Sequence, residues 1–165
     1  GGITYSLDLL GELLSLPQAV GIKMATLDSV MTYQDVANYI QKHHLDKVLI
    51  TGEDRMFGYT LTRGAKSALV GLGSICPAWQ RELLDSYADG RAEDFLQAMA
   101  LVDALAEITF IPPMEGYIER LLFFLAEQGI LSHNVVHDPY GPGVTELERA
   151  QITKFIREHG LEVGA

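Results

Sequence analysis

The sequence predicts an α/β fold, in which a small parallel sheet covered by helices is followed by a helical region. Helical and strand-like stretches alternate through the first half of the chain, and each strand-like stretch is nearly continuous in apolar residues. This pattern is typical of parallel strands buried beneath helices. From Pro77 onward the strand pattern stops. We therefore expect two parts, residues 1–89 with the sheet and residues 90–165 with helices alone.

The first helix is expected over residues 7–16, because Ser6 can cap it and Pro17 ends it. Four leucines at helical spacing give it one apolar face: Leu7, Leu10, Leu13 and Leu14. The apolar stretch 19–25 follows as the first strand.

A second helix is predicted over residues 30–44, with either Asp28 or Ser29 as its N-cap. Its inward positions are expected at Val30, Val36, Ala37 and Ile40. The elements that follow are a strand at 47–52, a glycine-interrupted helix at 55–65 and a strand at 67–73.

The second part is predicted to be helical throughout. Helices are expected over 77–88, 91–108, 116–129 and 145–159. The last begins with TELE, in which Thr145 and Glu148 have the spacing of a capping box.

The composition is that of an ordinary globular protein, with 48% hydrophobic and 21% charged residues in 165, enough for one domain with a sizeable core. The formal net charge of −10 argues against nucleic acid and anionic membranes as partners, because both reward basic patches. No apolar run is long enough to span a bilayer.

The single cysteine, Cys76, excludes a disulfide within the chain, so a reducing, cytoplasmic setting fits best. We expect Cys76 to be a small buried hydrophobe and Trp79 to pack in a helix interface. The sequence starts at Gly1 without a methionine or the basic region of a signal peptide, and it looks trimmed.

Lys23 is the candidate functional residue, since it is the only charge between Glu12 and Asp28 and lies near the end of the first strand. Strand residues alternate between faces, so the bulky residues share one face: Val20, Ile22 and Met24. On the other face, Lys23 has only small neighbours, which leave room beside its amine: Ala19, Gly21 and Ala25. An amine in a poorly solvated pocket loses its proton more easily and can form a Schiff base with a carbonyl carbon. The alternative is a lysine that extends from the strand end into water.

The histidines predict no metal site. His43 and His44 are adjacent at a helix end and point in different directions, which makes a poor metal pair. His133 and His137 lie in a loop near Asp138, without a third fixed ligand.

Two stretches of the chain, VGIKMATLDS and VLITGEDRMFGYTLTRGAKSALVGLGSICP, resemble the dihydrodipicolinate synthase/N-acetylneuraminate lyase family. The resemblance covers nearly the whole chain and corresponds to the C-terminal half of the family, from the helix after the fifth strand. It implies the C-terminal part of a (β/α)8 TIM barrel, with strands six to eight, followed by a C-terminal helical region. The GIK strand is the most specific element and places Lys23 on the family's Schiff-base lysine.

The resemblance also implies the chemistry. We expect a Schiff-base-forming lyase, an aldolase or a dehydratase, that acts on pyruvate or a related 2-oxo acid without metal or organic cofactor. Lys23 would be the nucleophile, and substrate contacts are expected from Gly52, Glu53, Asp54, Leu69 and Gly71. Glu53 and Asp54 could equally serve the next helix through capping and hydrogen bonds. Gly71 opens GLGSIC, which lacks the third glycine of a dinucleotide fingerprint and indicates a tight turn.

The chain departs from the family pattern in three places. The third strand reads Ser67 to Val70 where the family often has Gly-Val-Ile-Ser, and Ser74 stands where the family often has Asn. HDPY, beginning at His137, replaces an Arg-x-Pro-Leu stretch. These differences indicate a divergent member and leave the substrate open.

The family's fifth-strand tyrosine and its carboxylate-binding turn after the second strand lie outside the matched half. An open half-barrel would expose strand edges and apolar faces. We therefore expect a second segment to complete the barrel, either an N-terminal half from a nicked or split chain or a symmetry mate. The resemblance also implies an oligomeric enzyme. The alternative is a non-catalytic half-barrel whose role is association.

Overall fold

The computed structural model describes residues 5–27 and 29–162 and contains a three-stranded parallel sheet in the order β1-β2-β3. The strands are β1 (Gly21–Met24), β2 (Val48–Thr51) and β3 (Ser67–Ala68). Lys23 of β1 pairs with Ile50 of β2, and Ile50 pairs with Ser67 of β3. The predicted parallel arrangement is confirmed.

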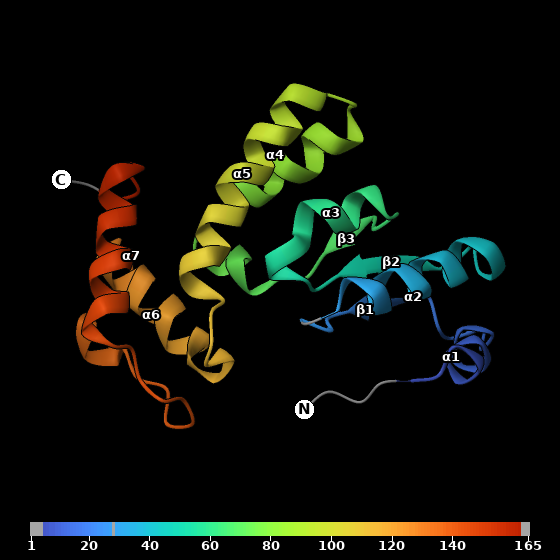
Figure 1. The fold of residues 1–165 in the computed structure, drawn as a ribbon, viewed down its shortest axis with the longest axis horizontal. Coiled ribbons are helices and arrows are strands. Elements are labelled where there is room, and N and C mark those ends of the chain that lie inside the picture. Colours follow the sequence, from blue (N-terminus) through green and yellow to red (C-terminus); the bar gives the residue numbers. More distant parts are fainter. Residues whose placement is uncertain (1–4, 28, 163–165) are drawn as a thin grey trace.

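Helices make up most of the described chain. The α-helices are α1 (Leu7–Leu14), α2 (Val30–His43), α3 (Phe57–Thr62), α4 (Pro77–Ala88), α5 (Ala92–Thr109), α6 (Tyr117–Glu127) and α7 (Glu146–Glu158). Short 3-10 turns occur at η1 (Asp54–Met56), η2 (Gly71–Ser74), η3 (Met114–Gly116) and η4 (His133–Val135). Figure 1 shows α6 and α7 at the end of the molecule opposite α1, with the sheet between them.

The sheet has one covered and one uncovered face. On the covered face, Met24 and Leu49 are buried in a cluster with side chains of α1 and α2. On the other face, Lys23, Val48 and Leu69 are exposed. Among the described residues, no helix covers the face that carries Lys23.

The third strand is shorter than predicted. The sequence predicts a strand over 67–73, but β3 ends at Ala68 and Gly71–Ser74 forms the η2 turn. The backbone N–H of Leu72 donates to the buried carboxylate of Asp54 at 2.8 Å. The carboxylate of Asp54 therefore binds the η2 turn that takes the place of the end of the predicted strand.

Four side chains predicted on packed faces are exposed instead: Leu7, Leu13, Val20 and Val30. Val20 is 77% exposed because it precedes the paired residues of β1. Val30 is the first residue of α2, whose buried face begins at Tyr33. In α1 the buried stripe is narrower than predicted and consists of Leu10 and Leu14 with Gly11 between them.

The predicted helix caps are confirmed. The side chain of Ser6 accepts the N–H of Leu9, and the side chain of Ser29 accepts the N–H of Thr32 at 3.1 Å. Thr145 forms the capping box of α7 with Glu148. Asp28, the alternative cap of α2, lies outside the described residues.

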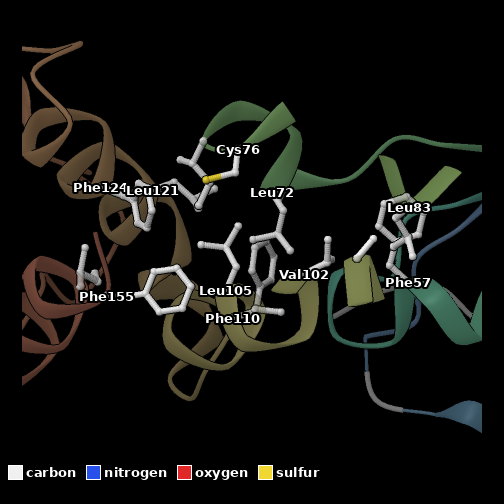
Figure 2. Packing of buried hydrophobic residues seen from close by; sticks show 14 of the residues in the cluster. Phe57, Leu72, Cys76, Leu83, Val102, Leu105, Phe110, Leu121, Phe124 and Phe155 are labelled. Atoms are coloured by element: carbon white, nitrogen blue, oxygen red, sulfur yellow. The ribbon is translucent and has the colours of Figure 1, made fainter. Parts of the chain in front are cut away.

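The larger hydrophobic core runs from the sheet to the C-terminal helices (Figure 2). It joins Phe57 and Leu72 near the sheet to Leu105 of α5, Phe124 of α6 and Phe155 of α7. Cys76 is buried within it, and Trp79 packs against it, edge-on to the ring of Phe155. Buried residues from Phe57 to Leu83 therefore share one core with the helices after position 89, while α1, α2 and the covered sheet face form a second cluster.

In the part of the chain that the structure describes, no single helix is long and apolar enough to cross a membrane. Taken together, α5 and the segment Met114–Glu127 have the length and apolar composition of a membrane span, but they are bent by 104° at the break between them.

Arg120 of α6 is fully buried and ties three helices together. Its Nε donates to Oε1 of Glu148 on α7 at 2.7 Å, and Nη1 donates to the Ile111 carbonyl, after α5, at 2.9 Å. A Cβ at Gly116 would lie 2.9 Å from Nη2, so the glycine leaves space for the guanidinium. A buried guanidinium stabilises the fold only while the carboxylate and carbonyl groups that bind it are present.

Arg120→Ala should lower the free energy of unfolding by about 3–5 kcal/mol, because Glu148 would lose its buried cation. Urea unfolding followed by circular dichroism measures this. The control is Arg81→Ala, which breaks the exposed Arg81–Asp85 pair of α4 and should cost less than about 1 kcal/mol. Equal losses in the two variants would contradict the structural role of Arg120.

Stability should also depend on the ionisation of Glu148. Burial acts to raise the pKa of Glu148, but hydrogen bonds from Thr145 and Arg120 outweigh it and hold the pKa below the usual 4.5. The unfolded state then binds this proton more readily, so the stabilisation is present above that value and is lost as the pH falls through the folded-state pKa. Glu148→Gln should flatten the fall in unfolding free energy below about pH 5, measured by urea titrations at stepped pH. A slope unchanged from wild type would rule this out.

Candidate functional site

Lys23 lies near the carboxyl end of β1, on the uncovered face, with its side chain exposed. The glycine that follows β2, Gly52, lies against its stem. A Cβ at Gly52 would collide with Cε of Lys23 and lie 2.8 Å from Cβ of Ala25. The missing side chain of Gly52 therefore provides the slot in which the lysine stem lies.

Glu53 follows Gly52 and points away from the open face. It is 1% exposed, and both carboxylate oxygens accept hydrogen bonds from the loop after β1. Oε1 accepts the N–H of Thr26 at 2.5 Å and its hydroxyl at 2.8 Å, and Oε2 accepts the N–H of Leu27 at 2.8 Å. Three donors satisfy the buried charge, so its carboxylate holds the loop.

Asp54 is buried on the other side of the same strand end. It accepts the N–H of Leu72 in the η2 turn. Burial raises the pKa of Asp54, while the amides of Leu72 and Gly71 and the positive charge of Lys23 act in the opposite direction.

Leu69 and Gly71 lie one strand further from Lys23. The N–H of Leu69 donates to the Thr51 carbonyl at 2.8 Å, and its side chain is 64% exposed. A Cβ at Gly71 would lie 2.7 Å from the ring of Phe110, at the end of α5. The ring of Phe110, from the helical part of the chain, therefore packs closely against the backbone of Gly71.

The arrangement gathers Lys23, Gly52, Glu53 and Asp54 around the ends of β1 and β2. Reasoning from sequence missed the loop residues Thr26 and Leu27. Leu27 is the one non-glycine residue with positive φ (60°) among those that the structure describes. The short polar stretch after the lysine was the only signal for this loop.

Among residues 5–27 and 29–162, no group of three histidine, cysteine, aspartate or glutamate side chains is placed to hold a metal ion. His133 lies instead beside Glu127, with 3.4 Å between Nε2 and Oε1.

The model of the dihydrodipicolinate synthetase family matches residues 1–159. The chain belongs to this family. N-acetylneuraminate lyase 2 of Escherichia coli O6:H1 is 24% identical over 141 residues, which are 86% of this chain and 44% of the lyase. The chain thus spans less than half the length of this curated relative.

Solved structures of dihydrodipicolinate synthase family members share the fold. Dihydrodipicolinate synthase from Oceanobacillus iheyensis superposes with a TM-score of 0.79 at 18% identity, over 94% of this chain and 51% of that one. YagE from Escherichia coli K12, a family member solved in complex with pyruvate, gives a TM-score of 0.69 at 17% identity, over 86% of this chain and 45% of that one.

Gly52→Ala should displace the stem of Lys23 and Ala25, at a cost of about 1–3 kcal/mol in unfolding free energy. It should also change the labelling of Lys23 by acetic anhydride relative to Lys66, read by peptide mass spectrometry. The matched control is Gly73→Ala, where a Cβ has nothing within 4 Å, and it should leave both measurements near wild type. Identical labelling in the two variants would contradict the slot.

Proposed function

We propose that this chain is the lysine-bearing half of a class I aldolase-type lyase, with Lys23 as the nucleophile. The observation that carries the proposal is the position of Lys23, at the carboxyl end of a parallel strand and on the one open face of the sheet. Catalytic groups of β/α barrels lie at the carboxyl ends of strands. Family membership supports the same assignment.

The proposed substrate is pyruvate or a related 2-oxo acid. The uncharged amine of Lys23 attacks the keto carbon, the carbonyl oxygen takes a proton, and loss of water leaves an iminium. The iminium accepts the electron pair when a C–C bond breaks or a proton leaves the adjacent carbon. The resulting enamine can attack an aldehyde or expel water. Family membership and the pyruvate complex of YagE favour this class of substrate.

The strands β1 to β3 are proposed to be strands six to eight of a (β/α)8 barrel, with residues 1–89 as the partial barrel and 90–165 as the helical region. The superposed relatives are about twice as long as this chain. The outer strands β1 and β3 are edges, and Val48 and Leu69 are exposed on the open face. A second segment with the rest of the barrel would cover all of these.

This second segment would also supply the acid–base group. Among the described residues, no tyrosine lies on the strand face that carries Lys23. General acid–base catalysis contributes typically 10²–10⁴-fold, so the chain alone should turn over slowly or not at all. An oligomeric, cytoplasmic enzyme without metal is the form that we propose for the completed barrel.

The second candidate function is that of a non-catalytic half-barrel that serves association alone. The exposed apolar side chains on the open sheet face favour it. The two candidates differ in whether Lys23 reacts with a 2-oxo acid.

Incubation with pyruvate and borohydride should add about 72 Da, the mass of a reduced pyruvyl group, at Lys23. The chain is tested alone and mixed with the amino-terminal half of a family member, by intact mass and peptide mapping. Lys23→Met should abolish the adduct, while Lys66→Met, which removes an exposed lysine beside β3, should keep it. If an intact family lyase is labelled and neither preparation is, the lysine proposal is wrong. Association without an adduct would favour the half-barrel.

A further inference from the structure

The loop after β1 contains a residue in an unfavourable backbone conformation, Leu27, and is bound by the side chain of Glu53. Leu27 has φ of 60°, in the left-handed region that is unfavourable for a residue with a Cβ. Its side chain is half exposed, so core packing does not fix the loop. Its N–H donates to Oε2 of Glu53 at 2.8 Å, and this bond stabilises the conformation.

Glu53 is well suited to hold the loop. Its carboxylate is buried and accepts three hydrogen bonds, two of them from consecutive backbone amides at Thr26 and Leu27. Charge-assisted bonds of this kind are roughly twice as strong as neutral ones. Oε1 accepts two of these bonds and Oε2 accepts the third, so both oxygens of Glu53 contact the loop.

Gly52, the residue before Glu53, contacts the end of β1. The N–H of Gly52 donates to the Met24 carbonyl at 2.6 Å, and the missing Cβ of Gly52 leaves space for the stem of Lys23. Glu53 then holds the backbone three and four residues beyond the lysine. The end of β1 is thus fixed to β2 on both sides of Ala25.

We propose that Glu53 is a positioning residue for Lys23, which clamps the Thr26–Leu27 loop and thereby sets where the lysine amine lies. This inference rests on the proposed function of Lys23. It assigns Glu53 no contact with the substrate. A displacement of about 1 Å in a reacting group can cost 10²-fold in rate. A small movement of the loop that shifts the Lys23 amine would therefore slow its reaction.

The test compares two buried carboxylates that each accept backbone N–H groups of a loop, one beside Lys23 and one in the helical part of the chain. Glu53→Gln places an amide N–H against the loop donors. Glu119→Gln is the matched control, because Glu119 is buried in α6 and accepts the N–H groups of Asp138 at 3.0 Å and Val144 at 3.3 Å, in the helical part of the chain. The rate of adduct formation at Lys23 is measured with saturating pyruvate and cyanoborohydride. The variants are tested in the preparation in which wild-type Lys23 forms the adduct, either the chain alone or the chain mixed with the amino-terminal half of a family member.

Glu53→Gln should slow labelling by about 10- to 100-fold, while Glu119→Gln should stay near wild type despite a similar loss in urea midpoint. Adding Leu27→Gly to Glu53→Gln should restore much of the rate, because glycine adopts a positive φ without strain. Equal slowing in both single variants, or no slowing in Glu53→Gln, would overturn the proposal.

A readout independent of activity separates this proposal from the function on which it rests. The ¹H–¹³C resonance of Lys23 Cε, in protein labelled at lysine, should shift in Glu53→Gln and remain in place in Glu119→Gln. If wild type forms no adduct but this shift occurs, the clamp stands and the lyase proposal fails. If the Lys23 resonance does not move in Glu53→Gln, Glu53 does not position Lys23, whatever the labelling shows.

Discussion

Two consecutive carboxylates at the end of the central strand hold the neighbouring loops in place. Glu53 binds the backbone after β1, and Asp54 binds the backbone after β3, so one strand end organises both of its neighbours. Burying two acids side by side is costly unless each is satisfied by donors. The loops supply those donors. The hydrogen bonds in turn stabilise loop conformations that are otherwise unfavourable, such as the left-handed backbone of Leu27.

The helical part relies on the same kind of interaction with different groups. Arg120 is buried between α5, α6 and α7 and satisfied by Glu148 and backbone carbonyls, while its neighbour Glu119 accepts backbone amides from the loop before α7. In both parts, charged side chains bind backbone groups that no helix or strand ladder satisfies. The larger apolar core contains both Leu72, whose N–H binds Asp54, and Phe110 at the end of α5, so the η2 turn packs against the helical part.

The sequence predicted what local chemistry determines. The parallel sheet followed from apolar runs, and the caps at Ser6, Ser29 and Thr145 followed from residue type and spacing. The η2 turn after β3 was not predicted, and the contact that binds it, from the Leu72 amide to Asp54, spans 18 residues. The role of Glu53 was left open between substrate contact and hydrogen bonding for a similar reason. Its partners lie 26 and 27 residues away, and nothing in TGED identifies them.

The open sheet face connects the chemistry of Lys23 to the completion of the fold. A lysine becomes a nucleophile when its surroundings disfavour the ammonium, and removal of water is the commonest way to do so. In this chain Lys23 is exposed, and so are the apolar side chains of Val48 and Leu69 on the same face. Whatever covers those side chains to remove apolar surface from water also removes water from the amine. Under the proposed function, closing the barrel and activating the nucleophile are therefore one event, which explains why Lys23 can be positioned by this half yet depend on another for its reactivity.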